Sequence, residues 1–167
     1  MPQPKQDHEV PIASPVTGTV IALADVPDPV FSSQAVGDGL GVQPDNGRVV
    51  APVTGAVTMV AATGHALGFK TDSGLEVLLH LGVDTVELNG GPFSLTVRVG
   101  DRVEAGDDLG SMDVNAIAAA GKDTTAIVVV TNTAAALAGL SVTTGPAAAG
   151  DQVASTKIGR ASCRERV

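Results

Sequence analysis

Short runs of β-branched and other apolar residues, separated by Gly, Pro or Asp, extend from Ile12 to about Val153. Examples are residues 18–23, 55–60, 75–80 and 126–130. Turn residues recur at intervals of roughly eight to twelve residues, which is the pattern of short strands joined by tight turns. The sequence therefore predicts an all-β fold, an antiparallel sandwich or barrel-like structure. A chain of 167 residues is long enough for one such domain with a real core.

Aliphatic residues must fill that core, because only 2% of the chain is aromatic, with three Phe and no Trp or Tyr. Hydrophobic residues make up 44%, chiefly Ala, Val and Leu. Two short segments, 114–120 and 133–138, have helical composition. The first is followed by Gly121, a residue type that commonly ends a helix. We expect one or two short helices beside the strands.

Two pairs of segments resemble each other. Residues 14–20 (SPVTGTV) match residues 51–57 (APVTGAV), and each pattern places Pro at the expected start of a strand. Residues 99–107 and 144–151 both contain Gly-Asp turns that lead into a new strand. The segments are either similar hairpins of one compact sandwich or two uses of a common strand opening. Both explanations predict β structure.

The net charge of −8 argues against a nucleic-acid partner and against adhesion to an anionic membrane, because both need a basic surface. An acidic surface suits a basic or neutral protein partner. Apolar runs such as 126–130 are far shorter than the roughly 20 residues of a membrane helix. The polar start, 1–9, lacks a signal-peptide stretch, and the single Cys163 forms no internal disulfide. We expect a cytoplasmic protein.

The chain divides into three parts on composition. We expect a flexible leader over 1–11, the β domain over 12–156, and a tail over 157–167 that is not native. The tail turns abruptly basic after an acidic, Ala-rich stretch, and it resembles the translation of a common DNA-sequencing adapter. Such a tail would have no part in the fold of the domain.

Histidine is the side chain here that titrates near neutrality, and the chain has three: His8 in the leader, His65 and His80. The strand period puts Glu76, Leu78 and His80 on one face. A His in an apolar strand is more often a packed core residue than a functional one. In a shallow apolar depression, however, desolvation would keep the ring neutral, and a neutral imidazole can attack a phosphoryl group.

His65 and His80 flank a predicted turn at 70–74, so antiparallel strands can bring the two rings side by side. Such a pair suggests a metal site or a phosphoryl-transfer pair. A catalytic zinc site needs a third ligand, for which Asp84 or Asp28 is available. The spacings His-x-His and His-Glu-x-x-His are absent, and so are the phosphate-binding P-loop and the Gly-x-Ser-x-Gly elbow.

An ordered series of motifs between Ile12 and Val153 resembles the glucose-type enzyme IIA of the bacterial phosphoenolpyruvate-dependent sugar phosphotransferase system. The matching stretches are 14–18, 25–31, 36–39, 51–55, 64–66 and 80–90 (HLGVDTVELNG). The last stretch is the most specific. The resemblance implies a β-sandwich phosphocarrier that uses no metal and no cofactor.

By position, the resemblance makes His80 the phosphorylated residue, which takes phosphate from the phosphohistidine of HPr and passes it to a cysteine of enzyme IIB of a sugar permease. It makes His65, supported by Thr63, the hydrogen-bonding partner of the phosphoryl group. It also implies a partner-binding surface, and contact with the membrane only through the permease. That surface comprises Asp28, Val30, Phe31, Val36, Leu78, Asp84 and Val86.

Three other functions compete with this one. Residues 99–109 are similar to a stretch of lipoyl- or biotinyl-type carrier domains, but 111–114 offers no acceptor Lys. A zinc hydrolase using His65, His80 and an Asp would hold stoichiometric zinc. A regulatory module that signals by its phosphorylation state is compatible with the phosphocarrier. Which sugar is served does not follow from the sequence.

Overall fold

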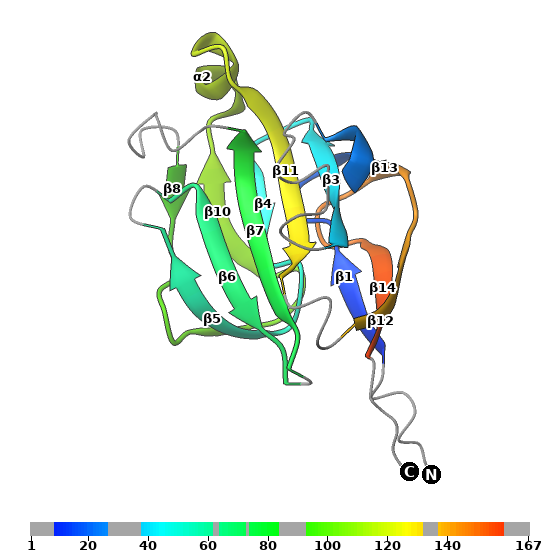
Figure 1. Cartoon of the computed structure of the whole chain (residues 1–167). Coiled ribbons are helices and arrows are strands. Elements are labelled where there is room, and N and C mark those ends of the chain that lie inside the picture. The colour runs from blue at the N-terminus through cyan, green and yellow to red at the C-terminus, as the bar shows by residue number, and fades with distance from the viewer. Residues whose placement is uncertain are drawn as a thin grey trace, which may run out of the picture.

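The computed structural model describes residues 9–26, 38–61, 64–72, 74–83, 93–131 and 137–158, and within them it contains fourteen strands and one α-helix (Figure 1). The strands are β1 (Glu9–Ala13), β2 (Gly18–Ala22), β3 (Asp38–Pro44), β4 (Arg48–Val50), β5 (Gly55–Val60), β6 (Ala66–Lys70), β7 (Glu76–Val83), β8 (Phe93–Leu95), β9 (Arg102–Val103), β10 (Asp108–Met112), β11 (Asp123–Val130), β12 (Leu137–Val142), β13 (Gly145–Ala147) and β14 (Gln152–Ile158). The helix is α2 (Val114–Ala119), and a 3-10 turn, η2, spans Leu23–Asp25.

The strands form three sheets in which every paired neighbour is antiparallel. The largest has eight strands in the order β13-β2-β3-β11-β7-β6-β5-β9. Two three-stranded sheets, β1-β14-β12 and β4-β10-β8, accompany it. The predicted all-β antiparallel sandwich is confirmed.

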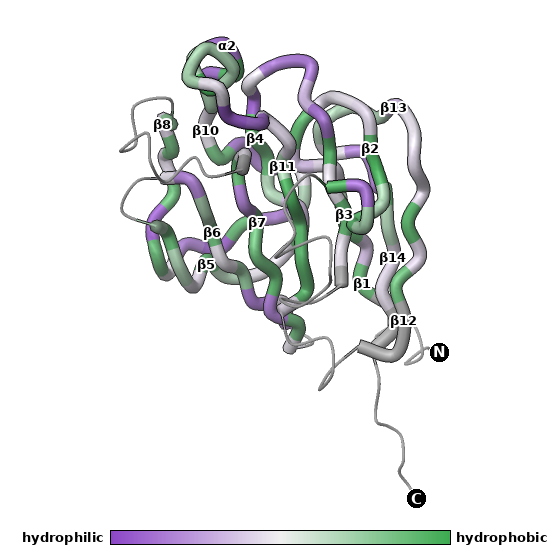
Figure 2. Tube along the Cα trace, turned by 45° about the horizontal axis from the view of Figure 1, so that its top comes forward, coloured by the Kyte–Doolittle hydropathy of each residue, from purple (hydrophilic) through white to green (hydrophobic). Residues whose placement is uncertain are grey.

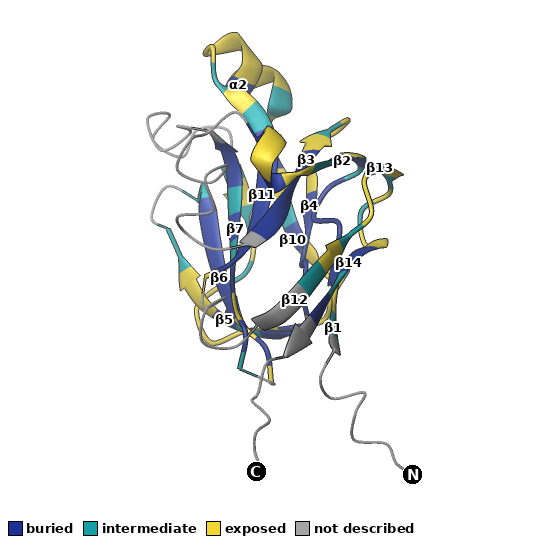
Figure 3. Ribbon diagram, turned by 45° about the vertical axis from the view of Figure 1, so that its right-hand side comes forward, coloured by how far each residue is buried: buried dark blue, intermediate teal, exposed yellow. Residues whose placement is uncertain are grey.

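Strands β7 and β11 lie side by side at the centre of the large sheet (Figures 1 and 3), and β11 is buried on both faces over residues 126–130. On one face, Leu79 and Val128 belong to the main core, which aliphatic residues dominate and to which Phe69 is the one fully buried aromatic contribution among the described residues. On the other face, a small second cluster contains Ile127 and Val129. A strand buried on both faces needs a continuous apolar run, which is what 126–130 provides.

The two sequence repeats occupy equivalent places in the large sheet. Read from either end, its order runs through an edge strand (β13 or β9), a repeat strand (β2 or β5), a partner (β3 or β6) and a central strand (β11 or β7). In both halves a glycine opens the repeat strand so close to its neighbour that a side chain has no room. A Cβ on Gly18 would lie 2.0 Å from the carbonyl oxygen of Gln43, and one on Gly55 would lie 2.3 Å from that of Lys70.

Equivalent residues of the two halves also make the same hydrogen bonds. The backbone N–H of Ser14 donates to Asp151 at 2.8 Å, as that of Ala51 does to Asp107 at 2.8 Å. In the reverse direction, the N–H of Gly150 donates to the Ser14 carbonyl oxygen and that of Gly106 to the Ala51 carbonyl oxygen, both at 2.9 Å. A threonine hydroxyl accepts in each half as well: Thr17 Oγ1 from the Ala149 N–H at 2.9 Å, and Thr54 Oγ1 from the Ala105 N–H at 3.0 Å. Of the two explanations for the repeats, the structure favours similar hairpins within one duplicated architecture.

Helix α2 has the ends that its sequence predicts. The Asp113 carboxylate caps its start by accepting a hydrogen bond from the Ala116 N–H at 3.0 Å. Gly121 follows its last turn with a φ of 82°, the left-handed conformation that favours glycine. Within the described part of the chain, no helix is long and apolar enough to cross a membrane.

Three details differ from the sequence expectations. The repeat prolines, Pro15 and Pro52, precede their strands, which begin at Gly18 and Gly55. The helix predicted over 133–138 is wrong at its end, because Leu137 starts strand β12 and pairs with Ile158; residues 132–136 lie outside the described ranges. Strand pairing there overrides a weak helical propensity. Strand β1 already begins at Glu9, inside the predicted leader, and β14 extends to Ile158.

Candidate functional site

His80 lies on strand β7, where side chains alternate between the core and the outer face of the large sheet. Val77, Leu79 and Leu81 point into the core and are at most 2% exposed. Leu78 and His80 lie on the opposite face and are half-buried. The predicted division of this strand into two faces is confirmed, and His80 is not a residue of the main core.

His65 comes directly before strand β6, which pairs with β7. Ala66 lies opposite His80 in the register, and the Leu81 N–H donates to the His65 carbonyl oxygen at 2.7 Å. This pairing brings the two imidazole rings together, with centroids 5.2 Å apart and planes at 75° in an edge-on arrangement. The hairpin that the sequence predicts across 70–74 therefore does place the two histidines side by side.

A backbone carbonyl fixes the proton on the His80 ring. The Nδ1 atom lies 2.6 Å from the carbonyl oxygen of Gly82. A carbonyl oxygen can only accept a hydrogen bond, so Nδ1 must carry the proton and donate it. In the neutral ring the lone pair is then on Nε2. Gly82 has a φ of 82°, and this left-handed conformation is the one in which its carbonyl meets the ring.

His65 is held neutral near pH 7. Burial lowers the pKa of His65 below its usual range, and the neighbouring His80 ring lowers that pKa further. Removing a charged imidazolium from water is unfavourable, and a second positive ring beside it adds repulsion. A neutral His65 has one N–H to donate and one nitrogen to accept.

The neighbours of His80 and Leu78 on strand β11 are apolar and buried. Ile127 lies opposite His80 in the register and Val129 lies opposite Leu78. These two residues form the second cluster with Leu23 and Val26, and Leu78 packs against it. Figure 2 shows the hydrophobic residues running along β7 and β11. Ile127 and Val129 are thus shielded from water, and the half-buried Leu78 extends the apolar cluster toward the surface.

Most of the predicted site lies outside the described residues. These members are Thr63, Asp28, Val30, Phe31, Val36, Asp84 and Val86. Of the predicted partner-binding residues, Leu78 is described, and it lies on the same face as His80. Among the described residues, no three His, Cys, Asp or Glu side chains gather in a way that could hold a metal ion.

Two features of the site were not predicted. One is the Gly82 carbonyl as the group that orients the His80 ring. The signal was a glycine directly after the strand run, which marks a position of unusual backbone conformation. The other is the cover that Leu23 and Val26 provide over Ile127 and Val129. Nothing in residues 20–26 distinguishes that contact from ordinary strand continuation.

Comparisons with known proteins agree on one family. The family model described as "phosphoenolpyruvate-dependent sugar phosphotransferase system, EIIA 1" matches residues 10–136. The glucose-specific EIIA component of Staphylococcus aureus is 41% identical over 125 residues, which are 75% of each chain. The glucose-specific EIICBA component of Streptococcus pneumoniae is 49% identical over 121 residues, 72% of this chain. The beta-glucoside-specific EIIBCA component of Bacillus subtilis is 47% identical over 122 residues.

The chain spans 17% of the length of the Streptococcus component and 20% of that of the Bacillus component. The solved structure of glucose permease IIA from Mycoplasma capricolum has the same fold. It superposes with a TM-score of 0.80 at 35% sequence identity, and the match covers 88% of this chain and 95% of that one. The chain belongs to the EIIA 1 family of the sugar phosphotransferase system and is of the glucose type.

Proposed function

We propose that this protein is a phosphohistidine carrier of sugar uptake. His80 accepts a phosphoryl group from the phosphohistidine of HPr and passes it to a cysteine of enzyme IIB. The main support for the proposal is one observation: the Gly82 carbonyl oxygen accepts a hydrogen bond from the Nδ1–H of His80, which leaves the lone pair on Nε2 beside a second histidine. The partners proposed here place the reaction in the cytoplasm.

The chemistry needs no group beyond the two proteins. The Nε2 lone pair of His80 attacks the phosphorus, a new N–P bond forms, and the N–P bond of the donor breaks with its electron pair returning to the donor imidazole. In the second transfer a cysteine thiolate attacks the same phosphorus, and the electron pair of the N–P bond returns to Nε2. Both steps run through a loose transition state that gains mostly from positioning and charge stabilisation.

His65 supplies part of that stabilisation. Because its pKa is lowered, the ring is neutral and can donate an N–H to the phosphoryl oxygens without adding a full positive charge. The ring centroid lies 5.2 Å from that of His80, which leaves a phosphoryl group on His80 within its reach. Thr63 next to it supports the ring in this proposal.

The apolar face limits hydrolysis and receives the partners. Leu78 lies on the same face as His80 and packs against the buried Ile127 and Val129, so a docked protein that covers this face would exclude water from the labile phosphohistidine. We propose that Val30, Phe31, Val36, Leu78 and Val86 form the apolar part of the docking surface. Asp28 and Asp84 would steer a cationic partner.

A direct experiment tests the proposal. The protein is incubated with phosphoenolpyruvate, enzyme I and HPr, and its mass is followed. We expect a gain of one phosphoryl group that is labile in acid and stable in alkali. A protein that stays unmodified while HPr is fully phosphorylated would refute the proposal.

We also propose that residues 12–156 hold the carrier activity and that 157–167 contribute nothing to it. A few residues just outside 12–156 still belong to the sheet, since β1 begins at Glu9 and β14 ends at Ile158. Resequencing the source locus tests the origin of the tail: a reading frame that continues differently after about residue 156 supports it, and an identical frame contradicts it.

A further inference from the structure

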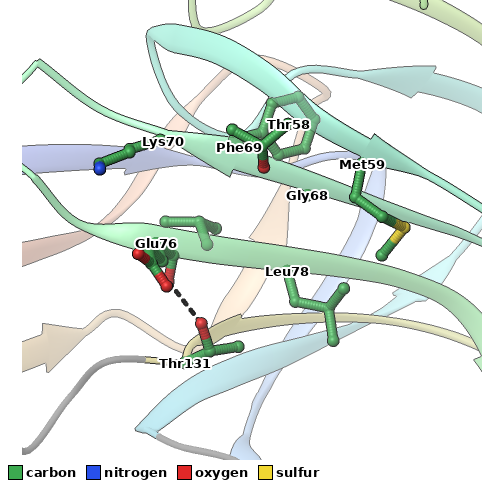
Figure 4. A pocket seen from close by; sticks show the side chains of 9 residues that line it. Thr58, Met59, Gly68, Phe69, Lys70, Glu76, Leu78 and Thr131 are labelled. Atoms are coloured by element: carbon green, nitrogen blue, oxygen red, sulfur yellow. Dashed lines mark hydrogen bonds between the residues drawn. The ribbon is translucent and has the colours of Figure 1, made fainter. Parts of the chain in front are cut away.

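A groove lies on the outer face of the large sheet, beside the histidine pair. It has a volume of about 490 Å³ and is bounded by Met59, Gly68 and Leu78, with Thr58 and Thr131 at its sides (Figure 4). Lys70 and Glu76 lie at one end of the groove, and Met59 and Leu78 lie near Gly68 toward the other end. Met59 is 38% exposed, which makes it one of two large hydrophobic residues in the described ranges that are open to solvent.

Local backbone structure creates the groove. Gly68 lies opposite Leu78 on β7 and opposite Met59 on β5, and it has no side chain to fill the space between them. The register of β5 against β6 shifts between Val57 and Met59, as in a β-bulge. As a result both Thr58 and Met59 face Gly68, each with an atom 3.1 Å from the position of a Cβ there.

The duplicated architecture contains a second groove of the same design, and there it is filled. Gly41 on β3 is the equivalent of Gly68, because it lies opposite Ile21 on the repeat strand β2 and opposite Ile127 on the central strand β11. Val26 covers it: its Cγ2 atom lies 2.7 Å from the position of a Cβ on Gly41. The chain itself thus shows that a groove of this design accepts one aliphatic side chain.

The connections between strands explain why one groove is filled and the other open. The segment between β2 and β3 spans residues 23–37, and its first part returns over the sheet as η2 and Val26. The segment between β5 and β6 is only residues 61–65, of which 61, 64 and 65 are described. The side-chain atoms nearest to the position over Gly68, Met59 Cβ and Thr58 Oγ1, belong to the neighbouring strand β5. Within the described part of the chain, no residue of a connecting segment covers Gly68 as Val26 covers Gly41.

The open groove lies inside the area that a phosphoryl partner must cover. Leu78, its wall, precedes His80 by two residues on the same face, which is roughly 7 Å along a strand. A standard interface buries about 800 Å² on each partner, equivalent to a disc of roughly 16 Å radius. A protein centred on His80 therefore reaches the groove. Met side chains suit a surface that two different partners share, because they adapt their shape.

We propose that the groove over Gly68 receives one aliphatic side chain of the protein that docks over His80, in the way that Val26 fills the groove over Gly41. Lys70 and Glu76, paired across β6 and β7, place both signs of charge at one end, so the groove does not favour a charged side chain. The inference rests on the proposed function, since it assigns a contact to the phosphoryl donor.

The substitution Gly68→Val tests the proposal, because the new valine side chain would itself occupy the groove. The rate of His80 phosphorylation is measured against the concentration of phosphorylated HPr. We expect KM to rise about tenfold or more, as for the loss of one buried aliphatic side chain, while kcat stays within about twofold. Gly68→Ala should give a smaller rise. Met59→Ser removes one wall at an exposed position and should also raise KM without unfolding the protein.

Ser141→Val is the matched control, because it adds the same side chain at an exposed position of β12, in another sheet. It should leave KM unchanged. An unchanged KM in a folded Gly68→Val protein, with wild type active, overturns the inference and leaves the proposed function intact. If the wild-type protein accepts no phosphate, the proposed function itself fails. The inference would also be overturned if sedimentation showed that wild type is a dimer and Gly68→Val a monomer. The groove would then be occupied by a second copy of this chain.

Discussion

The Nδ1 atom of His80 donates a hydrogen bond to the carbonyl oxygen of Gly82, two residues further along the same strand, at 2.6 Å. The contact is local, so it forms whenever β7 forms and Gly82 keeps its left-handed backbone. It determines which nitrogen of the ring holds the proton and holds the plane of the ring in one orientation. The reactive nitrogen is therefore prepared before any partner arrives, which reduces the reorganisation that transfer requires.

Substitution of Gly82 tests this arrangement. Gly82→Ala puts a Cβ on a residue with a φ of 82°, which costs about 1–2 kcal/mol unless the backbone rotates and takes the carbonyl away from His80. We expect slower phosphorylation of His80 and a mixture of ring tautomers, measured by ¹⁵N NMR of the imidazole. Gly100→Ala, at a φ of 98° with nothing within 4 Å of its Cβ, should lower stability similarly and leave the tautomer unchanged.

Substitution of His80 and substitution of His65 should impair different steps of phosphoryl transfer. His80→Ala should take up no phosphate from HPr, because the attacking nitrogen is gone. His65→Ala should still be phosphorylated but should pass the group on poorly, since the stabilising donor is missing. Mass spectrometry of the protein and a coupled assay with enzyme IIB measure the two steps separately. A His65→Ala protein that transfers at the wild-type rate would contradict the role given to His65.

His65 should make stability depend on pH. Its pKa in the folded protein is lowered below the ordinary 6.5, chiefly by burial and then by His80. Between the lowered pKa and 6.5 the unfolded chain binds more protons than the folded one, so the free energy of unfolding rises with pH across that interval and levels off above it. Denaturant titrations at about pH 5 and about pH 8 should show a smaller difference for His65→Gln than for wild type. An equal difference in the two proteins would show that His65 does not titrate differently on folding.

Equivalent glycines of the two repeats should be equally sensitive to substitution. Gly18→Ala and Gly55→Ala each force a Cβ against a backbone carbonyl, 2.0 Å and 2.3 Å away. Backbone must move in both cases, and we expect a loss of about 3 kcal/mol from each. Gly74→Ala, where a Cβ meets nothing within 4 Å, should cost only about 1 kcal/mol for its left-handed backbone. Thermal or denaturant unfolding measures all three, and a large loss at one repeat alone would contradict their equivalence.

The local pattern of the sequence was enough to predict the β fold, the hairpin of His65 and His80, and the end of α2 at Gly121. Each depends on interactions between residues close in sequence: alternation along a strand, a tight turn, a helix cap. The largely aliphatic core also followed from composition, because few aromatic residues were available. The division of β7 into a core face and an outer face was correct for the same reason.

Features that depend on packing between distant segments did not follow from the sequence. Strand β12 begins at Leu137, inside the helix expected over 133–138, because pairing with β14 outweighs the local preference there. The contact of Val26 with Gly41 joins the residue after η2 to a residue of β3, and no periodicity of the sequence indicates it. The open groove over Gly68 was missed too, although a glycine in the middle of a strand is a known sign of close approach or missing bulk.

Strands β1 and β14 pair along their length, with Glu9 opposite Lys157, at the end of the molecule away from α2 and the tip of β7 (Figure 1). A polypeptide joined before β1 and one joined after β14 would thus depart from the same corner. A linker at either end would therefore hold the domain by this one corner, opposite the tip of β7, the strand that carries His80.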